Sequence, residues 1–180
     1  MKTSNWTTWL ALVSLVGVSL VGCGEDALRP VREEARPTTP PEETTRYELR
    51  IRGVRARGYT AALVGIESLT ATVEGRPIAV RLRANHINLA DTEHAHLVGE
   101  FYLPEGASDV RLSVRLGAFG GFEHASGAGM IDARTGPLTV DTQVESLRRN
   151  GRATLLLDVE KSLTPEGRGR LLLPRTRLVY

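Results

Sequence analysis

Cysteine is almost absent from this chain of 180 residues, which contains only Cys23. One thiol cannot form a disulfide within the chain or build a zinc site from several thiolates. Tryptophan occurs only as Trp6 and Trp9, close to the start. Because protein sites for sugars generally stack them on exposed aromatic rings, this shortage counts against a typical carbohydrate-binding site.

Long apolar runs are also scarce, and the longest covers residues 9–21, which are 13 residues without a charge. A membrane-spanning helix needs about 20 apolar residues, whereas the core of a signal peptide has about 7–15. Lys2 supplies the positive charge that precedes such a core. The run therefore predicts a cleaved signal peptide over residues 1–22.

The end of this run, Leu20-Val21-Gly22-Cys23, resembles the lipobox of bacterial lipoproteins. The resemblance implies cleavage between Gly22 and Cys23, a diacylglyceryl group on the cysteine sulfur and usually an N-acyl chain such as palmitate. Each buried methylene contributes about 0.8 kcal/mol, so several chains anchor a protein firmly. We therefore expect an extracytoplasmic cell-envelope protein held on a membrane surface. Gly24, where some bacteria place an aspartate to retain lipoproteins in the inner membrane, favours the outer membrane. The alternative is an ordinary secretory signal with a coincidental cysteine.

Residues 24–45 differ in composition from the rest, with four prolines, six acidic residues and few apolar ones. Such a segment buries too little apolar surface to offset the entropy cost of ordering it. The interpretation is a lipidated cysteine followed by a disordered linker over residues 23–45, with the folded domain over 46–180. A lid or a strand added to the domain is the alternative.

The domain shows the period-two alternation of β-strands. Val110, Leu112, Val114 and Leu116 alternate with polar residues, and residues 155–159 alternate likewise except for the apolar Leu156. Asn150-Gly151 between two such runs is a hairpin signal, and residues 86–97 are the one candidate helix. Short strands separated by turns predict an all-β, antiparallel β-sandwich of about 8–10 short strands.

The four histidines fall between His86 and His124. His94 and His96 are candidate metal ligands, because residues two apart in a strand point to the same face. Asp91, Glu93 or Glu123 could add an oxygen ligand; exposed polar residues on a loop are the alternative.

His124 and Ser126, near Asp132, have the residue types of a catalytic triad. However, the serine is not in a Gly-x-Ser-x-Gly motif. The glycines over residues 117–129 favour a flexible strand connection instead, so no catalytic residue is predicted.

Two basic runs contain four arginines each: Arg50, Arg52, Arg55 and Arg57, then Arg168, Arg170, Arg175 and Arg177. Such runs could contact anionic lipid, lipopolysaccharide or polysaccharide, or could be solvated strand faces paired with acids. Removal of residues 1–22 leaves 22 basic and 21 acidic residues, a balance that argues against a nucleic-acid partner.

Several segments of the domain resemble a family of uncharacterised bacterial lipoprotein β-sandwiches, a domain of unknown function with a transthyretin-like or immunoglobulin-like fold. The segments that carry the resemblance are residues 102–106, 110–116, 155–163 and 170–179. The resemblance implies a membrane-tethered sandwich and brings no catalytic residues.

The expected function is that of an envelope lipoprotein acting as a non-enzymatic binding or structural module, without a cofactor. Its expected partners are the membrane, through Cys23, and an envelope protein or polysaccharide. The alternative function is metal or glycan binding within the region from His86 to His124.

Overall fold

The computed structural model describes residues 44–180, most of which lie in strands. The elements in chain order are β1 (Thr44–Val54), β2 (Tyr59–Val73), β3 (Arg76–Pro77), β4 (Val80–Leu82), β5 (His86–Asn88), β6 (His96–Pro104), β7 (Asp109–His124), β8 (Gly127–Asp132), β9 (Leu138–Gln143), α1 (Val144–Asn150), β10 (Arg152–Asp158), α2 (Val159–Ser162), β11 (Leu163–Glu166), β12 (Gly169–Leu172) and β13 (Thr176–Val179). β1 thus begins two residues before the expected domain boundary. No helix within the described range is long and apolar enough to cross a membrane.

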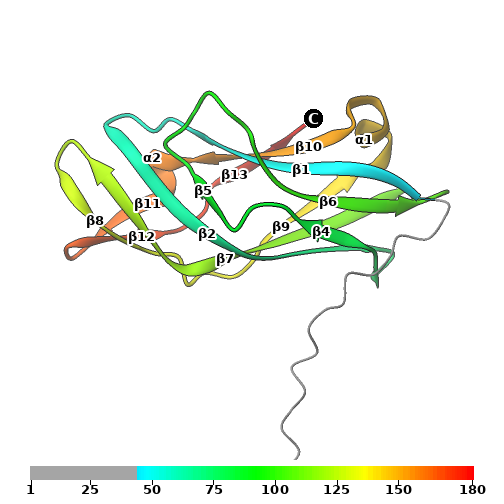
Figure 1. Cartoon of the computed structure of the whole chain (residues 1–180), viewed down its shortest axis with the longest axis horizontal. Helices are drawn as coiled ribbons and strands as arrows, with labels where there is room; N and C mark the ends of the chain where they lie inside the picture. The colour runs from blue at the N-terminus through cyan, green and yellow to red at the C-terminus, as the bar shows by residue number, and fades with distance from the viewer. Residues whose placement is uncertain (1–43) are drawn as a thin grey trace, which may run out of the picture. The chain divides into compact units, whose positions relative to one another are not determined.

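The strands form two sheets that pack against each other (Figure 1). Sheet A has the strand order β13-β10-β1-β6-β4. Sheet B has the order β11-β12-β8-β7-β2-β3, with β5 paired to β2 and β9 paired to β7. The prediction of an all-β sandwich is confirmed.

Both sheets are mixed, so the antiparallel arrangement predicted from the sequence holds for most strand pairs but not for two of them. β1 runs parallel to β10, from Glu48 opposite Arg152 to Val54 opposite Asp158, and β8 runs parallel to β12. The described residues form 13 strands, and β2 and β7 are long, with 15 and 16 residues. The parallel pair is possible because β9 and α1 carry the chain from sheet B to sheet A before β10 begins.

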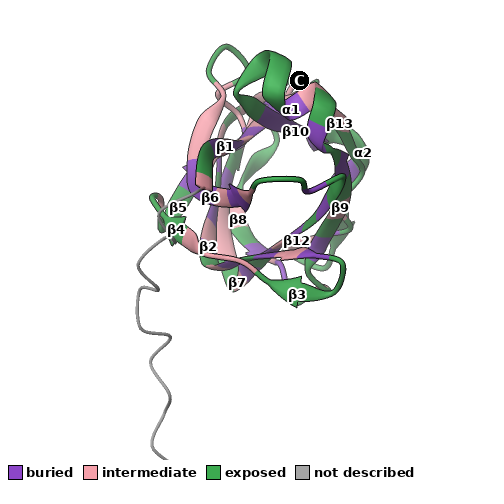
Figure 2. Ribbon diagram, turned by 90° about the vertical axis from the view of Figure 1, so that its right-hand side faces the viewer, coloured by how far each residue is buried: buried purple, intermediate pink, exposed green. Residues whose placement is uncertain are grey.

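The core lies between the two sheets, where alternate side chains point inward; in Figure 2 buried and exposed residues alternate along the ribbons. The largest fully buried side chains are Phe101, Leu49, Ile51, Leu89, Leu112, Ile131, Leu147, Leu155, Leu157, Leu172, Val64 and Val98. Each contributes about 1.5–3 kcal/mol through burial.

A short helix, α1, leads into Asn150-Gly151, where the sequence predicted a hairpin turn between two strands. Gly151, with φ 70°, ends α1 in the left-handed conformation, and its N–H donates to the Leu147 carbonyl at 2.7 Å. Glycine is favoured at this position because it has no Cβ. Val144 and Leu147 are buried, so one face of α1 adds to the core.

Two further expectations fail. Residues 86–97, the candidate helix of the sequence, form no helix. They contain β5, a loop and the start of β6. The glycine-rich segment is not a flexible loop, because β7 continues through it to His124. A Cβ on Gly120 would lie 2.2 Å from the Leu63 carbonyl oxygen, so glycine there lets β7 and β2 pack closely.

Candidate functional site

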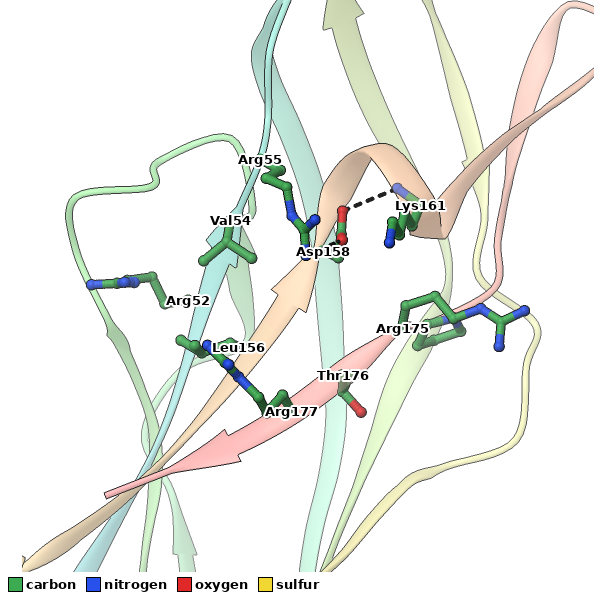
Figure 3. A pocket seen from close by; sticks show the side chains of 10 residues that line it. Arg52, Val54, Arg55, Leu156, Asp158, Lys161, Arg175, Thr176 and Arg177 are labelled. Carbon is green, nitrogen blue, oxygen red and sulfur yellow. Dashed lines mark hydrogen bonds and ion pairs between the residues drawn. The ribbon is translucent and has the colours of Figure 1, made fainter.

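A groove of about 900 Å³ lies on the outer face of sheet A (Figure 3). Its lining residues are Arg52, Val54, Arg55, Leu156, Asp158, Lys161, Pro174, Arg175, Thr176 and Arg177. Five of these are basic and one is acidic. Residues 44–180 contain 19 basic and 15 acidic side chains, which is an excess of four positive charges. The groove lining has the same excess, so outside the groove the positive and negative charges of this range balance.

Leu156 forms the floor of the groove and is apolar where the alternation of β10 leads one to expect a polar residue. In register it lies opposite Arg52 of β1 and Arg177 of β13. Only 8% of Leu156 is exposed. In Figure 3 Arg177 lies beside Leu156, whereas Arg52 extends away from it. The break in the alternation therefore places one apolar side chain at the base of the groove.

Asp158 fixes one wall of the groove. Its Oδ1 accepts a hydrogen bond from the Lys161 backbone N–H at 3.1 Å, which caps α2, and its Oδ2 lies 2.8 Å from the Arg55 guanidinium. Arg55 has a left-handed φ of 54°, and its carbonyl accepts the Glu160 N–H at 3.2 Å. That conformation is costly for a residue other than glycine, and contacts of both its backbone and its side chain hold it in place.

Ser162 fixes the opposite wall. Its carbonyl accepts the Leu173 N–H at 2.7 Å, and its Oγ accepts the Arg175 N–H at 2.8 Å. The Arg175 carbonyl in turn accepts the Asp158 N–H at 3.0 Å. The backbone that carries Arg175 is thus bound to α2 and β10, while its side chain extends outward in Figure 3.

Most of the cations in the groove have no anionic partner. Of the five groove cations, only Arg55 forms an ion pair with another residue of the described range 44–180, whereas the side chains of Arg52, Lys161, Arg175 and Arg177 form none. The Arg52 Nε is also buried without a hydrogen-bond partner in this part of the chain. An unsatisfied buried donor costs about 1–3 kcal/mol. The groove therefore contains an N–H group that no other group of residues 44–180 accepts from, and a ligand oxygen could accept this hydrogen bond.

A second groove of about 260 Å³ continues the first along β10. It shares Arg52 and Leu156 with the first groove and adds Arg50, Arg152 and Tyr180, among others. Arg50 is paired with Glu48 at 2.9 Å. The basic surface therefore extends along the outer face of β10.

The structure divides the two basic runs of the sequence. Arg52 and Arg55 from the first run meet Arg175 and Arg177 from the second in one groove. Arg170 instead lies over the Phe122 ring at 5.4 Å. The alternation of each run gave no sign of this division, which depends on the pairing of β1 and β13 with β10.

The candidate metal ligands do not share a strand face, because β6 begins at His96 and His94 precedes it. His94 Nδ1 lies 3.0 Å from Asp91 Oδ1, and this hydrogen bond lowers the pKa of Asp91. His96 Nε2 lies 3.0 Å from the Asn88 carbonyl oxygen and 3.8 Å from Asp91 Oδ2. Over residues 44–180, no group of three or more His, Cys, Asp or Glu side chains is placed to hold a metal ion.

The residues with triad chemistry are only partly brought together. His124 Nδ1 lies 2.8 Å from Ser126 Oγ, at the turn between β7 and β8. Asp132, however, is bound by the Arg134 Nε at 3.1 Å, and this contact lowers the pKa of Asp132 to about 2. Asp132 therefore does not orient His124 as a triad requires.

Gly22 and Cys23 lie outside the described residues, so cleavage and acylation stay predictions. The described part of the chain is a β-sandwich with two mixed sheets and a basic groove on sheet A. Comparison of the chain with protein-family models, curated proteins and solved structures found no match. The family resemblance stays a prediction as well.

Proposed function

We propose that this protein is a lipid-anchored, non-enzymatic binding module of the bacterial envelope that binds an anionic envelope component through the groove on sheet A. The observation that carries the proposal is the convergence of five basic side chains, four of them unpaired within residues 44–180. Four of the five are arginines, whose planar guanidinium donates paired hydrogen bonds to carboxylate and phosphate groups. A surface depression lined by one sign of charge also concentrates ligands of the opposite sign.

Binding rather than catalysis fits the chemistry of the lining. Asp158 is the acid among the ten lining residues, and Arg55 and the first turn of α2 already hold its carboxylate. The remaining polar groups of the lining are mainly hydrogen-bond donors, which suit oxyanions.

Anchoring in the proposal rests on the motif that ends at Cys23. Cys23→Ser should remove the acylated thiol, so labelled fatty acid should no longer enter the protein and the uncleaved precursor should accumulate. Mass spectrometry of the N-terminus and metabolic labelling measure both effects. Normal cleavage and labelling of the variant would refute the lipoprotein assignment.

Binding is tested by retention of the full chain, in neutral-lipid nanodiscs, on resins that carry polyphosphate, a uronic-acid polysaccharide or neutral dextran. The wild type should be retained on an anionic resin and elute with salt, because exposed charge pairs are screened. Arg52→Glu with Arg177→Glu should elute at much lower salt.

The matched control carries two charge reversals outside the groove, Arg115→Glu with Arg76→Glu; both residues are exposed on sheet B. It has the same net charge as the groove variant. If the control elutes as early as the groove variant, retention follows net charge and the groove is not the binding site.

A further inference from the structure

We propose that the ligand is a linear polyanion that lies along β10 and occupies both grooves, with a contact length of about 20 Å. This inference rests on the proposed function and names the shape and charge pattern of the ligand. Its shared chemistry is a chain of oxyanions, either phosphates or carboxylates.

The contact length follows from the strand register. The two grooves are lined by Asp158, Leu156, Thr154 and Arg152, which are alternate residues on the outer face of β10. Asp158 lies six positions after Arg152. At about 3.3 Å per residue, this path is about 20 Å long, which is more than a single small anion spans.

Cations follow this path at successive positions of β10. At the Asp158 end are Arg55, Lys161 and Arg175. Arg52 and Arg177 flank Leu156, since both lie opposite it in register.

The path continues towards the second groove. Arg50 lies opposite Thr154, and Arg152 ends the path. Pairs of alternate strand residues are about 7 Å apart, so an extended chain meets a cation at each step.

The two ends of the path differ in charge. At the first end, Asp158 neutralises one of the three cations Arg55, Lys161 and Arg175. At the second end there are two cations, and the acid Glu48 is paired with Arg50 and lies opposite Arg152. Between the two ends, the outward positions of β10 are Thr154 and Leu156, which are uncharged and buried. No acid on β10 therefore lies in the middle of the path. A short anion should therefore bind in the first groove, and only a longer one should reach Arg152.

The test uses the full chain in neutral-lipid nanodiscs and measures the Kd of linear polyphosphates and oligogalacturonates by calorimetry. Each series has extended lengths below, at and above about 20 Å, the length of the path. Affinity should rise with length up to that value and then level off. The series that binds more tightly identifies phosphate or carboxylate as the oxyanion.

Single neutral variants locate the two ends of the bound chain. Lys161→Gln should weaken short and long chains alike, by about two- to fivefold, the range for an exposed charge pair. Arg152→Gln should weaken only the long chains, by a similar factor. Arg115→Gln, the matched control on sheet B, should change neither, and thermal melting checks that each variant is folded.

The outcomes separate this inference from the proposed function. If orthophosphate binds as tightly as the long chains, or Arg152→Gln leaves long chains unaffected, contact is confined to the first groove and the linear-polyanion inference is wrong. The proposed function then stands. If Lys161→Gln and Arg177→Gln both bind long chains as the control does, the groove is not the binding site and both proposals fail.

Discussion

Gly53 lies in β1 between the groove residues Arg52 and Val54. Among the glycines of residues 44–180, it has the least space for a side chain. A Cβ at this position would lie 1.7 Å from the Leu89 carbonyl oxygen and 2.6 Å from its carbonyl carbon. Ordinary van der Waals contact begins at 3.4 Å, so Gly53→Ala would require the two backbones to separate by 1.7 Å. This substitution should therefore destabilise the domain.

The Leu89 segment cannot yield without losing other contacts. Leu89 is fully buried and its N–H donates to the Ala62 carbonyl at 2.8 Å, while Asn88 Oδ1 accepts the Ala62 N–H at 2.9 Å. Overpacking of a core costs about 1–3 kcal/mol, and a forced backbone shift brings the cost to the upper end. Unfolding entropy of about 2.1 cal/mol/K per residue converts about 3 kcal/mol into a Tm lower by about 10 °C for a domain of this size.

Differential scanning calorimetry of the full chain measures this change. Gly136→Ala is the matched control, because a Cβ there has no atom within 4 Å and its φ is not left-handed. The control should keep its stability within about 0.5 kcal/mol of the wild type. A Gly53→Ala variant that melts with the control would show that β1 and the Leu89 backbone are not in contact.

Other predictions concern the ion pairs, the core and the histidines. Arg134→Ala should raise the pKa of Asp132 from about 2 toward its ordinary 3.8 in an NMR titration. In the wild type the stabilisation from this pair is present above pH 3.8 and is lost as the pH falls through about 2. An unchanged titration would argue against the pair. Phe101→Ala, at a fully buried ring, should lower the free energy of unfolding in urea by about 3–5 kcal/mol, and a loss below about 1 kcal/mol would place Phe101 outside the core. His94→Ala with His96→Ala should leave the metal content unchanged by mass spectrometry; a lower content would restore the metal hypothesis.

The sequence predicted the strands well where burial depends on local alternation. The run from Val110 to Leu116 lies within β7, with its apolar side chains buried and its arginines exposed. The sequence did not predict α1, because its two buried side chains, Val144 and Leu147, are too few for a recognisable helical period. The glycine that resembled a hairpin residue ends that helix instead.

The groove was only partly predictable from the sequence. Arg52 and Arg177 belong to the two basic runs of the sequence, and Leu156 interrupts an alternating strand. Their association depends on the register of β1, β10 and β13, which no local pattern specifies. No sequence pattern predicts that Lys161 lies in the groove, because its position depends on the cap that Asp158 provides to α2.

The parallel pairing of β1 with β10 also determines when the groove can form. Glu48 is synthesised early, but its partner Arg152 follows 104 residues later in the chain. β13, which completes the groove, is synthesised after β10. Contacts so distant in the chain close slowly during folding. The arginines of the groove therefore stay apart until β13 docks onto sheet A, and binding of the proposed anionic ligand would depend on that last step.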